Sequence, residues 1–218
     1  MRQHAKYFYV LFFIVILSFI FWGVGTVDNN GSNRIIAEVG NRKITETEYY
    51  RAYDNTFRFY KDLYKEKFDE NMQKELNLKE SVLDMLVGNQ VLLHAAEKND
   101  IKVSDQELNE VITNEPAFMN NGVFDSQLYH NTLRLSRIAP ETYESMKRQE
   151  LTIIKMTRLI EISADQSSID LGSVSADDQT LTALKDALQN EARDRAVKAY
   201  IEGYKKTIKV KENRELIS

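Results

Sequence analysis

The chain has 218 residues, with 33 acidic and 29 basic side chains and a formal net charge of −4. This mild acidity argues against a general nucleic-acid binder, which would show a basic patch, and the absence of cysteine excludes disulfides and thiolate metal sites. The chain has only two prolines and eight glycines and is rich in helix formers, which favours a mainly helical fold.

The N-terminal region contains one long apolar segment, Tyr7–Val27, with no charged side chain. A helix needs about 20 such residues to cross a hydrocarbon core of about 30 Å. Arg2 and Lys6 precede the segment, whereas the first charge after it is Asp28. Because the positively charged end stays in the cytoplasm, the sequence predicts a cytoplasmic tail over 1–6, a single-pass inner-membrane anchor and an exported remainder.

A retained anchor has two alternatives, a cleaved signal peptide and a buried core helix. A cleaved signal peptide has an apolar region of about 7–15 residues that ends in a small-residue site, but this run is longer and Val24-Gly25-Thr26 is a poor cleavage site. A buried core helix would usually show a polar face, and this segment shows none. The retained anchor is therefore favoured over both.

A polar tether over 28–33 leads into the first predicted elements of the exported part. Residues Arg34–Thr45 alternate in polarity around Gly40-Asn41, which is typical of two strands joined by a turn. Thr45 and Glu48 have the spacing of a capping box, so a helix should begin there and run to about Phe68. Its stripe consists of Tyr49, Tyr53, Phe57, Tyr60 and Tyr64.

The middle of the chain predicts a central helix with shorter neighbours. Residues 69–77 read as a polar connector or short helix, and the broad apolar arc of Leu78–Asn99 predicts a helix packed on several sides. Ser104 and Glu107 form a second capping box, which predicts a short helix over Asp105–Thr113.

The second half begins with a break and ends with a strand. Asn120-Asn121-Gly122 marks a turn, after which Asp125 should cap a helix over Ser126–Arg134 and Pro140 should begin another that runs to about Ile162. A polar linker over 163–179 precedes a helix over about 180–205 and a strand over Thr207–Lys211. Because a lone strand is unstable, Ile208 and Val210 should pair with the region Arg34–Ile44. Three leucines of the last helix should pack on the helices before the linker: Leu181, Leu184 and Leu188.

This order of elements resembles the N-terminal chaperone region of the SurA and PpiD family of periplasmic folding factors, in particular its membrane-anchored members. The resemblance rests on the stretches FWGVG, AEVGNRKIT, TETEYYRAY, ESVLDMLVGNQVLLHAAEKND and PAFMNNGVFDSQLYHNTLRLSRIAPETYESMKRQEL, and more weakly on AVKAYIEGYKKTIKVKE. It implies a mainly helical chaperone domain over 34–162, completed by residues 180–218, with a small β element of two or three strands.

The chain departs from that family at one place. Family members commonly carry parvulin prolyl-isomerase domains between the two parts, but here only the linker over 163–179 stands there. A domain needs at least about 50 residues, so we expect no isomerase activity. The sequence contains no Gly-rich phosphate loop, nucleophile elbow or H-E-x-x-H motif, so we expect no enzyme of another kind either. His4, His94 and His130 are scattered, and we expect no metal or cofactor.

The candidate client-binding residues flank the turn at Asn120–Gly122: Phe118, Met119, Val123 and Phe124. Apolar residues on a loop are harder to assign to a core than those in a helix stripe, and methionine suits a surface that accepts many shapes. Core packing is the alternative for each of them. The resemblance implies an apolar cradle but does not name these positions.

The resulting hypothesis is a membrane-anchored periplasmic holdase for unfolded exported or outer-membrane polypeptides, held near the protein-export translocon by Tyr7–Val27. It would bind apolar and aromatic stretches without nucleotide, cofactor or nucleic acid. An assembly or scaffold subunit with one fixed partner at the export machinery is the alternative, and an isomerase remnant ranks third.

Overall fold

The computed structural model describes residues 34–164 and 178–217. The predicted tail, anchor and tether over 1–33 and most of the predicted linker lie outside the described residues. Within the described part, no helix is both long enough and apolar enough to cross a membrane.

A three-stranded antiparallel sheet joins the two ends of the described chain. Strands β1 (Ile35–Val39) and β2 (Arg42–Thr45) form the predicted hairpin, and β5 (Val210–Glu212) pairs with the other edge of β1, in the order β2-β1-β5. The hairpin turn needs Gly40, whose φ is +61°. The predicted C-terminal strand therefore exists, but it begins at Val210. Ile208 lies outside it, although its partly buried side chain still packs against the core.

Helix α2 (Glu46–Tyr64) begins at the predicted capping box. The Thr45 hydroxyl accepts from the Glu48 backbone N–H, and the Glu48 carboxylate accepts from the Thr45 N–H at 2.7 Å. A single turn, η1 (Lys65–Lys67), and a short helix, α3 (Glu70–Glu75), follow. The polar stretch 69–77 thus contains a short helix, capped by the side chain of Asp69.

The central helix α4 (Leu78–Lys98) packs under the sheet and α2. Ten of its residues are buried, on a broad arc as the sequence predicted. The first core cluster joins its N-terminal half to the hairpin and to the last residues of the chain: Ile36, Ala37, Val39, Ile44, Tyr49, Val82, Leu83, Val87, Val91 and Ile217.

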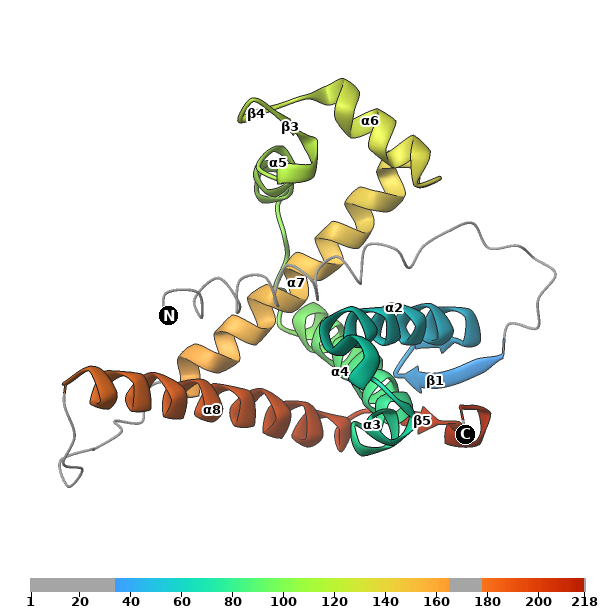
Figure 1. Ribbon diagram of the computed structural model, residues 1–218, viewed down its shortest axis with the longest axis vertical. Helices are drawn as coiled ribbons and strands as arrows, with labels where there is room; N and C mark the ends of the chain where they lie inside the picture. The colour runs from blue at the N-terminus through green and yellow to red at the C-terminus, as the bar shows by residue number, and fades with distance from the viewer. Residues whose placement is uncertain (1–33, 165–177, 218) are drawn as a thin grey trace.

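A second cluster forms the upper lobe in Figure 1. It contains α5 (Asp105–Thr113), η2 (Pro116–Phe118), the two-residue strands β3 (Met119–Asn120) and β4 (Val123–Phe124), and α6 (Ser126–Leu135). The Ser104–Glu107 capping box and the Asp125 cap are present as predicted. The core of this lobe consists of Val103, Leu108, Ile112, Phe118, Tyr129, Leu133, Ile138 and Tyr143.

We call the part built around the first core cluster the first lobe. Helix α7 (Pro140–Ala164) connects it to the upper lobe and runs diagonally between them in Figure 1. Its second half meets α4 and α8 (Asp178–Lys205) in a third cluster around Met156 and Ile160. The chain then forms β5 and η3 (Arg214–Leu216), where Arg214 Nη2 pairs with Asp84 Oδ1 of α4 at 2.6 Å. The C-terminal segment is thereby fastened to the first lobe.

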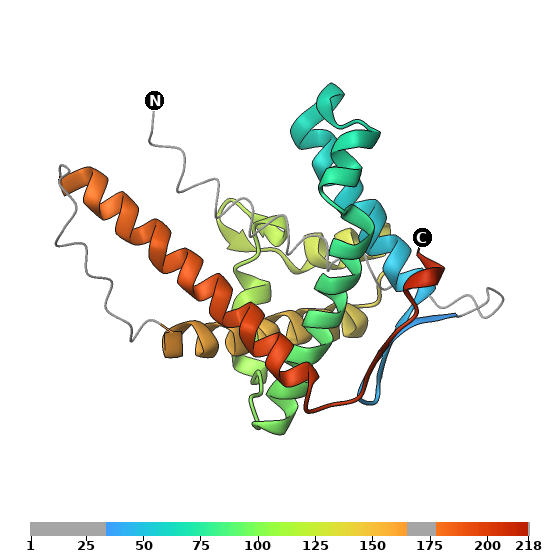
Figure 2. The ribbon, with the colours of Figure 1, turned by 90° about the horizontal axis from the view of Figure 1, so that it is seen from below.

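Helix α8 docks on the core clusters through its C-terminal half. The side chains packed against the clusters lie in its C-terminal half: Ala196, Val197, Tyr200, Ile201 and Tyr204. Figure 2 shows the N-terminal half of α8 extending away from the body. Leu181, Leu184 and Leu188 in that half are partly buried, and their packing on the helices before the linker stays a prediction.

Candidate functional site

The first candidate surface is an aromatic arm made by α2 and the segment after it. We define the aromatic arm as Tyr53, Phe57, Tyr60, Tyr64 and Phe68. Successive rings lie in contact range, with centroids 6.2 Å apart for Tyr53–Phe57, 5.2 Å for Phe57–Phe68, 5.9 Å for Tyr60–Phe68 and 6.0 Å for Tyr60–Tyr64. Ring pairs at these separations attract one another beyond the effect of burial alone.

The aromatic arm becomes more exposed toward its tip. At its base, Tyr49 is fully buried in the first core cluster and donates its hydroxyl to the Lys79 carbonyl oxygen. Phe57 and Tyr60 are half-buried, and Tyr64 is 38% exposed beside Leu63, which is 42% exposed. Figure 2 shows why: α2 and α3 project beyond the body of the first lobe. The rings therefore offer a connected apolar surface to solvent.

Electrostatics keep the base of this surface uncharged. Burial raises the pKa of the Tyr53 hydroxyl, and Asp54 raises it further. Burial also raises the pKa of Tyr49, helped by Tyr50 and Glu80. A tyrosine hydroxyl with its ordinary pKa of about 10 is already neutral at physiological pH, and these upward shifts of the pKa keep both phenols neutral, so an apolar ligand can contact them without removing a phenolate from water.

The second candidate surface is the β3–β4 hairpin with the four predicted client-binding residues. Asn121 and Gly122 have φ of +53° and +81°, which suits a two-residue hairpin turn. Met119 pairs with Phe124, and Asn120 pairs with Val123. The turn places Val123 at the tip, where 70% of its surface is exposed, while Met119 and Phe124 are half-buried.

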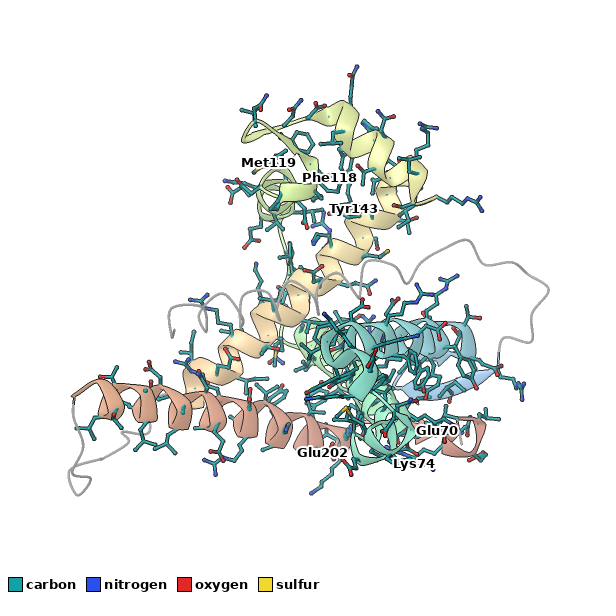
Figure 3. The ribbon with its side chains drawn as sticks, in the orientation of Figure 1. Glu70, Lys74, Phe118, Met119, Tyr143 and Glu202 are labelled. Atoms are coloured by element: carbon teal, nitrogen blue, oxygen red, sulfur yellow. The ribbon has the colours of Figure 1, made fainter. Side chains whose placement is uncertain are left out.

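Phe118 does not lie at a rim, contrary to the sequence-based expectation. It is 1% exposed, and its ring centroid lies 4.9 Å from that of Tyr129 and 5.5 Å from that of Tyr143, both in edge-to-face geometry. Figure 3 shows Phe118 and Tyr143 between the hairpin, α6 and α7. Pro116 starts the turn η2, which directs Phe118 inward. Client contact by the four residues stays a prediction, and Val123 is the most exposed of them.

A buried ion cluster holds the upper lobe on α7. Lys147 Nζ lies 3.2 Å from Glu115 Oε2, in the connection between α5 and η2, and 3.1 Å from Glu150 Oε2. Lys147 and Glu150 are each 3% exposed. Burial raises the pKa of Glu150, and Lys147 partly opposes that shift. Ions this deeply buried are costly unless they are paired, so we interpret the cluster as a structural connection rather than a binding site.

The described histidines have structural contacts. His94 Nδ1 lies 3.2 Å from the Tyr204 hydroxyl, which links α4 to α8, and the His130 ring packs edge-on against Tyr129. His4 lies outside the described residues. Within the described part of the chain, no group of three or more His, Cys, Asp or Glu side chains could hold a metal ion.

Further exposed apolar side chains lie at helix ends, where sequence reasoning did not place a site. Leu135 at the end of α6 is 77% exposed, and Leu159 and Ile162 near the end of α7 are 49% and 54% exposed. The aromatic stripe of α2 is visible in the sequence, but its spacing fits core packing as well as a binding surface. Only its position beyond the body of α4 shows that the outer half is accessible.

The amino-acid sequence of the chain is similar to that of known proteins of one family. The model of the SurA-like N-terminal domain family matches residues 1–157. The periplasmic chaperone PpiD of Escherichia coli K12 is 25% identical over 146 residues, which cover 66% of this chain and 23% of that protein. PpiD of Haemophilus ducreyi is 24% identical over 162 residues, covering 72% and 26%.

A third relative carries a different name from the PpiD proteins. The foldase protein PrsA of Caldanaerobacter subterraneus subsp. tengcongensis is 31% identical over 125 residues, covering 51% of this chain and 40% of that protein. The chain spans about a quarter of the length of the PpiD relatives it matches. The family model covers well over half of this chain, so the protein belongs to the family of SurA-like N-terminal domains.

Proposed function

We propose that this protein is a periplasmic chaperone that holds unfolded exported polypeptides on an apolar and aromatic surface. The observation that carries the proposal is the aromatic arm, whose rings form a connected and partly exposed surface on a projecting helix. The names of the PpiD relatives support a role of this class, although a shared fold alone does not establish a function. Outer-membrane polypeptides are among the clients that such a surface suits.

The proposal includes a membrane anchor over Tyr7–Val27, with residues 1–6 in the cytoplasm and the described domain in the periplasm. The sequence of that segment supports it, because 21 uncharged, mostly apolar residues suffice to span a bilayer. Anchoring raises the local concentration of the chaperone near the export translocon, which makes weak contacts effective.

The proposal also excludes prolyl-isomerase activity. The linker over 163–179 is far shorter than the minimum of about 50 residues for a domain. In a proline-peptide assay, the full chain should match the uncatalysed rate of isomerisation. A rate of proline isomerisation clearly above the uncatalysed rate would contradict the proposal that the chain lacks isomerase activity.

The decisive experiment compares two pairs of exposed side chains. Leu63→Ser with Tyr64→Ser alters the tip of the aromatic arm, and Leu159→Ser with Ile162→Ser alters a similarly exposed control site on α7. Both double variants should melt within a few degrees of the parent, since exposed substitutions usually change stability by about 0.5 kcal/mol or less. Only the arm variant should lose suppression of the aggregation of an unfolded model client. Equal loss in both, or in neither, would contradict the proposed site.

The scaffold alternative makes a different prediction for partners. A scaffold subunit would bind one stoichiometric partner at the export machinery, whereas a holdase would contact many clients. A photo-crosslinking residue in place of Tyr64 distinguishes them. A ladder of many crosslinked products supports the chaperone, and a single product supports the scaffold.

A further inference from the structure

The two faces of the three-stranded sheet differ sharply in their surroundings. Helices α2 and α4 contact the sheet on one face, where Ala37, Val39 and Ile44 are buried. In Figure 2 the strands lie at the periphery of the molecule, with these helices on one side of them. The described part of the chain places no element with comparable contacts on the outer face.

The outer face carries a row of lysines around one carboxylate. The register places Glu38 opposite both Lys43 on β2 and Lys211 on β5. Lys209 precedes β5 by one residue, and its carbonyl oxygen accepts from the Gly40 N–H at 2.8 Å. Because side chains alternate along a strand, Lys209 and Lys211 lie on the same face. We define Lys43, Lys209 and Lys211 as the lysine face, and all three are exposed.

The positive charge of the lysine face is only partly offset by its surroundings. None of the three lysines has an ion pair with another residue that the structure describes, and Glu38 is the one carboxylate in their row. Nearby acidic side chains are already paired elsewhere, Glu46 with Arg34 at 3.1 Å and Glu212 with Arg214 at 2.6 Å. Lysines on edge strands also prevent two sheets from pairing edge to edge. That role would apply wherever the sheet lies, so it does not explain a position next to the membrane.

The path of the chain indicates what the lysine face meets. Arg34 directly precedes β1, and only six residues, 28–33, separate it from the predicted anchor. Six extended residues reach about 20 Å at most. The row through Glu38 lies four residues farther along β1, or about 14 Å. If Tyr7–Val27 spans the bilayer, the sheet is held next to the membrane surface.

We propose that the lysine face docks on anionic phospholipid head groups of the membrane that holds the anchor. The inference rests on the proposed anchor and adds an orientation to it: the outer face of the sheet is turned toward the bilayer and the aromatic arm is left free. Each basic residue near an anionic surface shifts such an equilibrium about fivefold. Removing all three charges should therefore lower the docking equilibrium constant by about two orders of magnitude, and added salt should weaken docking by screening.

A single fluorescent label can report this orientation. The chain has no cysteine, so Asn41→Cys at the exposed β1–β2 turn gives one labelling site. Energy transfer to a head-group-labelled lipid is measured for the full chain in vesicles of phosphatidylcholine, with or without phosphatidylglycerol. The test variant is Lys43→Gln with Lys209→Gln and Lys211→Gln. The control, Lys61→Gln with Lys65→Gln and Lys67→Gln, removes the same charge from the far end of α2.

We expect phosphatidylglycerol to increase energy transfer, salt to reverse the increase and only the test variant to abolish it. A chain that floats with phosphatidylcholine vesicles but transfers energy equally in both lipids retains its anchor and overturns the lysine-face proposal. A chain that floats only with phosphatidylglycerol, through the three lysines, supports the lysine face without the anchor. A chain that floats with neither overturns both. If the test variant instead reduces client holding without lipid and leaves energy transfer unchanged, the face binds polypeptide and the lipid proposal is wrong.

Discussion

Replacing Phe118 with alanine should strongly destabilise the upper lobe rather than weaken client binding selectively. The Phe118 side chain is 1% exposed and makes edge-to-face contacts with Tyr129 and Tyr143. Deleting a buried phenylalanine ring usually costs about 3–5 kcal/mol, a figure that combines lost burial with the cavity left behind. This is a large part of a typical total stability of about 5–15 kcal/mol. Phe118→Ala should therefore lower the midpoint of chemical denaturation strongly.

The matched control is Val123→Ala, at the tip of the same hairpin. Val123 is 70% exposed, so its truncation should change the free energy of unfolding by about 0.5 kcal/mol or less. Denaturant titration followed by circular dichroism gives both values. Hydrogen exchange should show faster exchange in α5 and α6 of Phe118→Ala while β1 stays protected.

A loss of stability below about 1 kcal/mol for Phe118→Ala would refute the reasoning. It would mean that the Phe118 ring contributes little to the core and that neighbouring side chains fill the cavity left by its removal. If this variant also lost client holding, Phe118 would return to the set of client-binding residues.

Three further predictions concern the connections between the parts of the molecule. Ile217→Ala should cost about 2–5 kcal/mol and should accelerate hydrogen exchange in β1, because this 2%-exposed side chain fills the first core cluster; unchanged exchange in β1 would show that the C-terminal segment is not part of that core. Lys147→Met should cost about 3–5 kcal/mol, because it leaves the Glu150 carboxylate buried without its cation, and adding Glu150→Gln should restore part of the loss; a double variant no more stable than Lys147→Met would contradict this coupling. Lys155 and the capping box lower the pKa of Glu107 from 4.5 to about 2, so the stability that the ionised carboxylate contributes is complete above about pH 4.5 and is lost as the pH falls toward 2. Glu107→Gln should therefore reduce the fall in melting temperature between these pH values. An unchanged fall would exclude Glu107 as its source.

The sequence by itself determined most of the local structure of the described residues. Both capping boxes, the Asp125 cap and the Gly40 turn form where they were predicted. These features depend on hydrogen bonds between residues two to four apart and on backbone angles that few residue types adopt. The periodicity of the apolar residues likewise located α4 and α7, because a helix must bury one continuous side.

Pairing of the C-terminal strand with β1 was also predictable, because each end of the described chain lacked a partner. Its register was not. Three backbone pairs, rather than the apolar alternation, define β5, which therefore begins at Val210 and leaves Ile208 outside.

Only the tertiary structure decided which apolar residues are core and which are surface. Phe118 and Val123 flank the same turn, yet one is buried against two tyrosines and the other faces solvent. The aromatic stripe of α2 is continuous in sequence. The first core cluster, which includes α4, buries its base, whereas Phe68 is packed against Phe57 farther along the helix. Local sequence sets the direction of a side chain relative to its own helix or turn. Whether that direction ends in protein or in water depends on what the rest of the chain places opposite it.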